Sequence, residues 1–206
     1  GLNFQGSRMM RNRIFPDDYD QLPEGSVVDG ALQEEDRTDI ADYVVIGSGA
    51  GGATAAYTLS SEGYSVILLE EGPWVRTREF GVDVHPALGK MFRESASSTT
   101  VGKAPFTVLQ GRCVGGGTTV NSAIAIRPHE RVLDRWSYHY KLGNTISMSD
   151  LEEQFDYLDQ TLTVTPVRES ALGENNRIFG EAAAKRGILA ERIRRYDAGC
   201  EATASC

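Results

Sequence analysis

The sequence is poor in cysteine and has no long apolar run, and each shortage excludes a class of protein. Its three cysteines, Cys113, Cys200 and Cys206, are too few and too scattered for a disulfide framework, which favours a reducing, cytoplasmic compartment. No apolar run approaches the length of a membrane span. We therefore expect neither a disulfide-stapled fold nor a membrane-spanning one.

Basic residues are also scarce. The chain has 21 Lys and Arg against 29 Asp and Glu, a formal net charge of −8, whereas a nucleic-acid partner would require a basic face. The 206 residues, 40% of them hydrophobic, are enough for one large domain with a real core. Residues 1–7, GLNFQGS, look like the leftover of an engineered protease site, so we exclude them and take Met9 or Met10 as a native start without a secretory signal.

Residues 42–72 have the pattern of a strand, a glycine turn, a helix and a second strand. Residues 42–46, DYVVI, predict a strand buried on both faces of a sheet. The helix that follows is rich in alanine and ends at Gly63. Residues 64–69 predict the second strand, with Glu70 at its tip. The order of these elements indicates an α/β fold with a mostly parallel sheet.

The turn in this unit fits G-x-G-x-x-G. Gly47 permits the tight turn, Gly49 lets the backbone approach a pyrophosphate, and Gly52 lets the helix pack close to the sheet. Glu70 lies about 20 residues further on, where a carboxylate accepts hydrogen bonds from a ribose and disfavours a 2′-phosphate. The alternative is an ordinary glycine-rich turn, but the three spaced glycines and the acid at the tip of the second strand would then have to occur together by chance. The predicted dinucleotide site comprises Gly47, Ser48, Gly49, Ala50, Gly51, Gly52 and Glu70.

A second glycine-rich stretch covers residues 110–128, QGRCVGGGTTVNSAIAIRP. Gly115, Gly116 and Gly117 allow backbone torsions that other residues adopt at a cost, and Thr118, Thr119 and Asn121 add hydrogen-bonding side chains. Such a loop can lie flat against a planar ligand or a phosphate, although a purely structural glycine turn stays open at this point. Cys113 has no histidine near it in sequence, which favours a packing role over a nucleophilic one.

The rest of the chain has weaker signals. Residues 11–40 predict a polar arm over the domain, whose acids Asp17, Asp18 and Asp20 indicate a solvated face rather than a metal site, and residues 73–109 predict a long surface excursion. We expect this excursion to be held by Phe80, Met91, Phe92 and Phe106.

Two helices are predicted further along. The first is capped by Ser149 with Glu152 three residues on, and carries the apolar stripe Leu151, Phe155, Leu158 and Leu162. The second covers residues 174–186, ends at Gly187, and turns inward the side chains of Ile178, Phe179, Ala182 and Ala183. Arg192, Arg194 and Arg195 indicate local charge balance.

Taken together, the two glycine stretches resemble those of the glucose–methanol–choline (GMC) flavoprotein oxidoreductases. DYVVIGSGAGGATAAYTLS followed by VILLEEGP resembles the family's FAD fingerprint, and GRCVGGGTTVNSAIAIRP, ending near Trp136, resembles its second signature. The resemblance runs from about Asp42 to the C-terminus. It implies a Rossmann-type FAD-binding domain and the oxidation of an alcohol by hydride transfer to FAD. The bacterial and long-chain alcohol or sterol-oxidising branches are the most similar.

The resemblance also assigns roles by position. The three glycines of the first motif would hold the FAD pyrophosphate and Glu70 the adenosine ribose. Some members carry a histidine that tethers the flavin, and Val120 stands at that position here, so we expect non-covalent FAD. Gly116, Gly117 and Thr118 would approach the flavin side of the cofactor, and Asn121, Ser122, Ala123 and Ile124 would line the isoalloxazine ring.

This sequence departs from the family in its length and in the absence of the family's catalytic histidine. Family members are more than twice as long, and their catalytic histidine lies near the C-terminus, whereas His85, His129 and His139 match no such motif. We therefore expect no catalytic residue here, an incomplete substrate region, and a second chain or missing C-terminal half as partner beside the alcohol substrate. Cys200 and Cys206 alone cannot hold an iron–sulfur cluster, and we expect no metal.

Two other functions stay open on the sequence. The first motif alone would permit an NAD-dependent dehydrogenase, and the missing base would permit a non-catalytic nucleotide-binding or assembly module. The expected organisation is an arm over residues 8–41, an FAD-binding core with both glycine motifs over residues 42–136, and a helical continuation over residues 137–206 that starts the substrate region.

Overall fold

A computed structural model describes residues 26–76, 79–81, 83–141 and 146–197. These residues form two units that meet in sequence between Asn121 and Ser122. The residues Asp17, Asp18, Asp20, Cys200 and Cys206, for which the sequence predicts no metal site, lie outside the described residues. The domain boundaries expected at residues 41 and 136 stay predictions.

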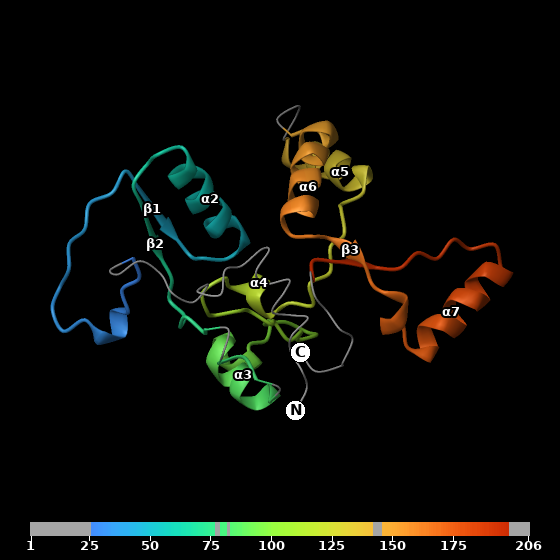
Figure 1. Ribbon diagram of the computed structural model, residues 1–206, viewed down its shortest axis with the longest axis horizontal. Coiled ribbons are helices and arrows are strands. Elements are labelled where there is room, and N and C mark those ends of the chain that lie inside the picture. Colours follow the sequence, from blue (N-terminus) through green and yellow to red (C-terminus); the bar gives the residue numbers. More distant parts are fainter. Residues whose placement is uncertain (1–25, 77–78, 82, 142–145, 198–206) are drawn as a thin grey trace. The chain divides into compact units, whose positions relative to one another are not determined.

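The first unit is built on a parallel strand pair joined by a helix (Figure 1). Strand β1 (Tyr43–Ile46) pairs with β2 (Val66–Leu69), with Tyr43 opposite Val66 and Ile46 opposite Leu69. Helix α2 (Ala50–Ser61) connects them. The predicted strand, glycine turn, helix and strand are therefore confirmed, with β2 starting at Val66 rather than at residue 64.

Helix α2 ends where the sequence predicts. Gly63 has a φ of +91°, and its N–H donates to the Ser60 carbonyl over 3.0 Å. The N–H of Tyr64 reaches back to the Leu59 carbonyl over 3.2 Å. These two bonds make a Schellman motif, which requires the left-handed conformation that glycine adopts without strain.

A side-chain clamp joins the start of β1 to the start of β2. The Asp42 carboxylate accepts from the Ser65 N–H at 2.8 Å and from the Ser65 hydroxyl at 2.6 Å. The Asp42 N–H donates to the Ser65 hydroxyl oxygen at 2.9 Å. The Ser65 hydroxyl and N–H hold the pKa of Asp42 below its usual value, because both bonds favour the charged carboxylate.

Replacing Asp42 by asparagine is expected to lower the melting temperature at pH 7. A depressed carboxylate pKa adds stability that is present above the unfolded pKa, about 3.9, and is lost as the pH falls through the lower folded value. The gap between wild type and Asp42→Asn should therefore close in acid. Thermal unfolding from pH 7 to pH 3 measures it, with Asp36→Asn as control, an exposed acid that makes no hydrogen bond within the described residues. A gap that persists at pH 3 would contradict the clamp.

The expectation that β1 is buried on both faces is wrong for this structure. Val44 is 57% exposed and Ile46 is 84% exposed. The reason is that β1 pairs with β2 alone in the described part of the chain, and α2 covers the pair with small side chains. An α/β arrangement is present, but its parallel sheet has two strands.

The excursion after β2 contains the core of the first unit and helices that the sequence did not predict. Helix α3 (Val84–Met91) is followed by a 3-10 segment, η3 (Arg93–Ala96). The buried cluster consists of Val75, Met91 and Cys113, with Phe92 packed against it. Met91 and Phe92 therefore hold the excursion as expected, whereas Phe80 and Phe106 are exposed. Pro86 and Gly89 hid α3 from the sequence pattern.

The second unit holds three helices within its described residues: α5 (Glu130–Tyr140), α6 (Met148–Thr161) and α7 (Glu174–Lys185). Helix α5 was missed, although Leu133, Trp136 and Tyr140 stand at helical spacing in it. Helix α6 begins earlier than predicted, because Ser147 and Asp150 form the capping box in place of Ser149 and Glu152. A short 3-10 turn, η4 (Glu169–Ala171), precedes α7, and β3 (Thr165–Pro166) pairs antiparallel with β4 (Arg194–Arg195).

The apolar faces predicted for these helices are only partly buried. Leu158 and Leu162 of the α6 stripe are exposed, as are Ile178 and Phe179 of α7, whereas Ala183 is buried. Gly187 ends α7 with a φ of +67°, as predicted. The arginines do provide local charge balance: Arg194 pairs with Asp159 at 2.9 Å and Arg195 with Asp197 at 3.1 Å.

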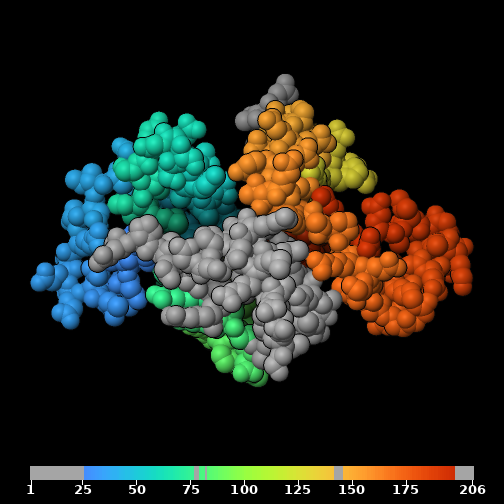
Figure 2. All heavy atoms as spheres, viewed as in Figure 1, coloured from blue at the N-terminus to red at the C-terminus, as the bar shows by residue number. Residues whose placement is uncertain are grey.

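The described part of the N-terminal arm makes few contacts. It contains one 3-10 turn, η1 (Gly30–Leu32), capped by Asp29. Leu32 and Ile40 are exposed, and Figure 2 shows this stretch, in blue, as an extended line of atoms. No strand forms at Val27 and Val28. Among the described residues, no helix is both long and apolar enough to cross a bilayer.

Candidate functional site

The two glycine stretches, far apart in sequence, come together in the first unit. A Cβ placed on Gly116 would lie 3.1 Å from the Cα of Gly49. Gly72, which follows Glu70, packs on the same loop, because a Cβ there would lie 2.3 Å from the Arg112 carbonyl carbon. The predicted dinucleotide turn and the second glycine loop therefore form one site.

Gly47 and Gly52 have the structural roles that the motif predicts. Gly47 has a φ of +90°, and its N–H donates to the Leu69 carbonyl at 2.7 Å, which ties the turn to β2. A Cβ on Gly52 would lie 1.8 Å from the Gly47 carbonyl oxygen. Helix α2 can therefore start this close to β1 only with glycine at position 52.

The N-terminus of α2 is open to an anion. Gly49 is the N-cap, and no side chain caps the first turn. The first intrahelical bond runs from the Ala53 N–H to the Gly49 carbonyl at 2.8 Å. A Cβ on Gly49 itself would meet no atom within 4 Å. Unpaired N–H groups and the positive end of the helix dipole fit a phosphate group at this point.

Ser48, the residue between Gly47 and Gly49, connects the site. It is 3% exposed. Its hydroxyl donates to Glu70 Oε2 at 2.6 Å and accepts from the Gly115 N–H at 2.9 Å. Its own N–H donates to the same Glu70 oxygen at 2.9 Å. We call the bonds from Ser48 to Glu70 and Gly115 the Ser48 bridge.

Glu70 is held by its own chain at the end of β2. Its second oxygen, Oε1, accepts from the Gly72 N–H at 2.9 Å. Burial acts to raise the pKa of Glu70, but hydrogen bonds from Ser48, Gly72 and Glu71 outweigh it and leave the pKa below its usual value. Glu70 is therefore a fixed carboxylate at neutral pH. The sequence had placed the acid correctly, yet it had not indicated that Ser48 would orient it.

The second glycine loop folds on the buried core. Gly115 and Gly116 have φ values of +90° and +55°, and a single helical turn, α4 (Gly117–Val120), follows. The Thr118 hydroxyl donates to the Gly115 carbonyl at 2.5 Å. Cys113 is fully buried beneath the loop, and burial raises the pKa of its thiol, which supports the expected packing role.

The four residues expected at the isoalloxazine ring are divided between the units. Asn121 caps the C-terminal end of α4 in the first unit. Ala123, with a φ of +56°, accepts from the Tyr196 N–H at 3.0 Å in the second unit. Ile124 forms an isolated bridge with Arg195, and Ser122 begins the unit. The grouping of these residues around one ligand stays a prediction.

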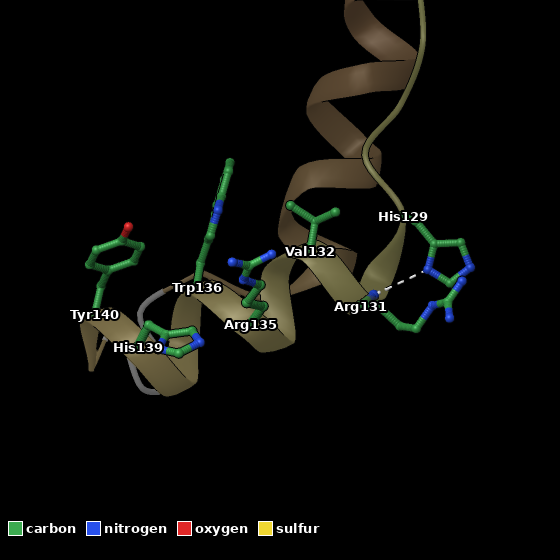
Figure 3. A pocket seen from close by; sticks show the side chains of 7 residues that line it. All are labelled: His129, Arg131, Val132, Arg135, Trp136, His139 and Tyr140. Carbon is green, nitrogen blue, oxygen red and sulfur yellow. Dashed lines mark hydrogen bonds between the residues drawn. The ribbon is translucent and has the colours of Figure 1, made fainter. Parts of the chain in front are cut away.

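The three histidines lie outside this site's hydrogen-bond network. His85 is on α3, whereas His129 caps α5 by accepting from the Arg131 N–H at 3.2 Å, and His139 lies in the last turn of α5 (Figure 3). His129 and His139 line a shallow hollow on α5 together with Arg131, Val132, Arg135, Trp136 and Tyr140.

Comparison with known proteins identifies the family. The family model described as GMC oxidoreductase matches residues 41–206. The chain belongs to the GMC oxidoreductases, and the resemblance inferred from the two glycine stretches is confirmed.

Several curated relatives are similar over about half of the chain or more. An uncharacterized GMC-type oxidoreductase of Mycobacterium tuberculosis is 37% identical over 168 residues, which are 81% of this chain and 26% of the relative. A long-chain-alcohol oxidase of Arabidopsis thaliana is 32% identical over 157 residues, 75% of this chain and 20% of the relative. An oxygen-dependent choline dehydrogenase of Brucella anthropi is 30% identical over 115 residues, 47% of this chain and 19% of the relative. The chain thus spans about a quarter of the length of the first of these.

Proposed function

We propose that the chain binds FAD non-covalently and forms the cofactor-binding part of an oxidoreductase that oxidises the CH–OH group of an alcohol. The observation that carries this proposal is the contact between the two glycine stretches at Gly49 and Gly116. A nicotinamide-binding turn requires only the first stretch. The presence of the second loop against it favours a larger, flavin-containing dinucleotide.

The relatives support the reaction class more than the substrate. One is named for long-chain alcohols and another for choline, and both substrates are alcohols. The matched residues lie in this chain, and neither relative's name indicates a pocket there that would select one alcohol over another. We therefore assign alcohol oxidation as the activity and small-molecule alcohols as the substrate class.

Each part of the site has a proposed role in holding the cofactor. The turn at Gly47, Gly49 and Gly52 binds the pyrophosphate, and Glu70 binds the adenosine ribose. Gly116, Gly117 and Thr118 approach the flavin side, and residues 121–124 line the ring. When bound, FAD supplies the redox chemistry by accepting the hydride. This chain's residues bind and orient it. The chain spans 26% of the length of the first relative, and the proposal assigns the proton acceptor to the remaining part of the protein.

A visible absorption spectrum of the purified protein is expected to show bound flavin. Acid precipitation should release that flavin into the supernatant, because Val120 offers no nucleophile for a covalent tether and packs against the core beside Cys113. Flavin that stays with the precipitate would contradict non-covalent binding. A colourless protein that binds NADH tightly would replace the proposal with a nicotinamide-dependent function.

The alcohol assignment has its own test. On the protein as its native gene encodes it, anaerobic addition of a long-chain primary alcohol or of choline should bleach the flavin absorption. A protein that binds FAD but is reduced by no alcohol would instead support a non-catalytic nucleotide-binding module.

A further inference from the structure

We propose that Ser48 is a positioning residue that couples the adenosine end of the cofactor site to the second glycine loop. The proposal rests on the function proposed above, since it concerns the same site. It starts from the position of Ser48, which the G-x-G-x-x-G pattern leaves free to be any residue. A hydroxyl here is therefore a property of this chain and not a requirement of the turn.

The Ser48 hydroxyl uses both of its capacities. A serine hydroxyl donates once and accepts through its lone pairs. Here it donates to Glu70 Oε2 and accepts from the Gly115 N–H. Beside this bond the two backbones approach each other closely, since a Cβ on Gly116 would lie 3.1 Å from the Gly49 Cα. The hydroxyl is thus a polar connection between the two loops.

The acceptor capacity of Glu70 makes this connection responsive to a ligand. A carboxylate has about four acceptor positions. Ser48 takes two with its N–H and its hydroxyl, the Gly72 N–H takes a third, and the Glu71 N–H also bonds to this carboxylate. A ribose hydroxyl therefore has to share a Glu70 oxygen with one of these donors. Binding of the ribose hydroxyl restricts the motion of Glu70 and of the Ser48 hydroxyl that donates to it. The Gly115 N–H donates to this hydroxyl, so its hydrogen bond is strengthened as well.

The first test needs no variant. ADP contains the ribose and diphosphate that the first motif binds but has no flavin. Adding ADP to the wild-type protein should slow amide hydrogen exchange at Gly115 by about fivefold, the change expected for one strengthened hydrogen bond. The Gly115 N–H already has Ser48 as its acceptor, so ADP cannot produce the effect by taking that proton itself. Unchanged exchange at Gly115 with ADP bound would overturn the proposal.

The second test removes the hydroxyl. Ser48→Ala should weaken FAD binding by about tenfold and ADP binding by less, because ADP gains from the bridge through Glu70 alone, whereas the flavin end of FAD also approaches the second loop. Ser48→Thr keeps the hydroxyl and should restore the wild-type affinity for FAD. Ser61→Ala, an exposed serine at the far end of α2 from the site, is the control. Equal losses for FAD and ADP, or failure of Ser48→Thr to restore FAD binding, would overturn the coupling.

The outcomes separate this proposal from the proposed function. If the wild-type protein binds no FAD, the proposed flavin cofactor is wrong. A wild-type protein that binds FAD with the same affinity as Ser48→Ala leaves the flavin assignment in place and ends the role of Ser48.

Discussion

Replacing Gly52 by alanine is expected to destabilise the first unit by about 3 kcal/mol, at the upper end of the usual cost of overpacking. The new Cβ would lie 1.8 Å from the Gly47 carbonyl oxygen and 3.4 Å from a methyl group of Val45. The first of these neighbours is backbone, so it cannot rotate away. Either α2 shifts from β1 or the tight turn opens. Thermal or urea unfolding of the variant measures the loss.

The neighbouring residue provides a matched control for this stability experiment. Gly51 is also a glycine in the first turn of α2, but a Cβ there meets no atom within 4 Å. Gly51→Ala should leave the stability unchanged or raise it by about 0.5–1 kcal/mol, because alanine loses less backbone entropy in a helix. Equal stabilities for the two variants would mean that α2 does not pack against the turn as described.

The sequence predicts the first unit's frame well, because local chemistry decides it. A strand, three spaced glycines and a helix stop at Gly63 are all local signals, and each appears where the pattern puts it. Burial was not predicted in the same way. Val44 and Ile46 have the composition of a buried strand, but burial depends on partners that are distant in sequence.

Helix boundaries show the same division between local and distant information. The capping pattern occurs twice in a row, at Ser147 and at Ser149, and the sequence alone does not say which serine caps the helix. Helix α5 has a local signal that the prediction did not use, since Leu133, Trp136 and Tyr140 stand at helical spacing. Of its residues, Leu133 is the buried one, so the stripe did not predict burial.

The sequence predicts the residues of the candidate site but not the hydrogen bonds that connect its two glycine loops. The glycines and Glu70 follow from the motif, whereas the Ser48 bridge depends on Gly115, 67 residues further on. One signal could have indicated it. The residue after Gly47 and the residue after β2 both stand at the carboxyl ends of adjacent parallel strands, where side chains meet. A hydroxyl and a carboxylate at those two positions are therefore expected to bond.

Replacing Gly49 by alanine is expected to raise the dissociation constant for FAD about a hundredfold, equivalent to roughly 2.7 kcal/mol, without unfolding the protein. Gly49 has a φ of −64° and a ψ of −177°, which alanine adopts without strain. Its Cβ would meet no protein atom within 4 Å. The added methyl group would instead occupy the approach of the pyrophosphate to the start of α2. Flavin fluorescence titration measures the affinity, and thermal unfolding without FAD measures the stability.

The pair Gly49→Ala and Gly52→Ala separates binding from folding within one turn. The first variant should keep the apo melting temperature and lose FAD, whereas the second should lose stability whether or not FAD is present. Gly89→Ala, an exposed glycine in α3 with open space at its Cβ, controls for a glycine-to-alanine change elsewhere in the unit. Wild-type FAD affinity in Gly49→Ala would show that the pyrophosphate does not approach this backbone. In that case the turn would be a packing device for α2, and the second glycine loop would have to hold the cofactor without it.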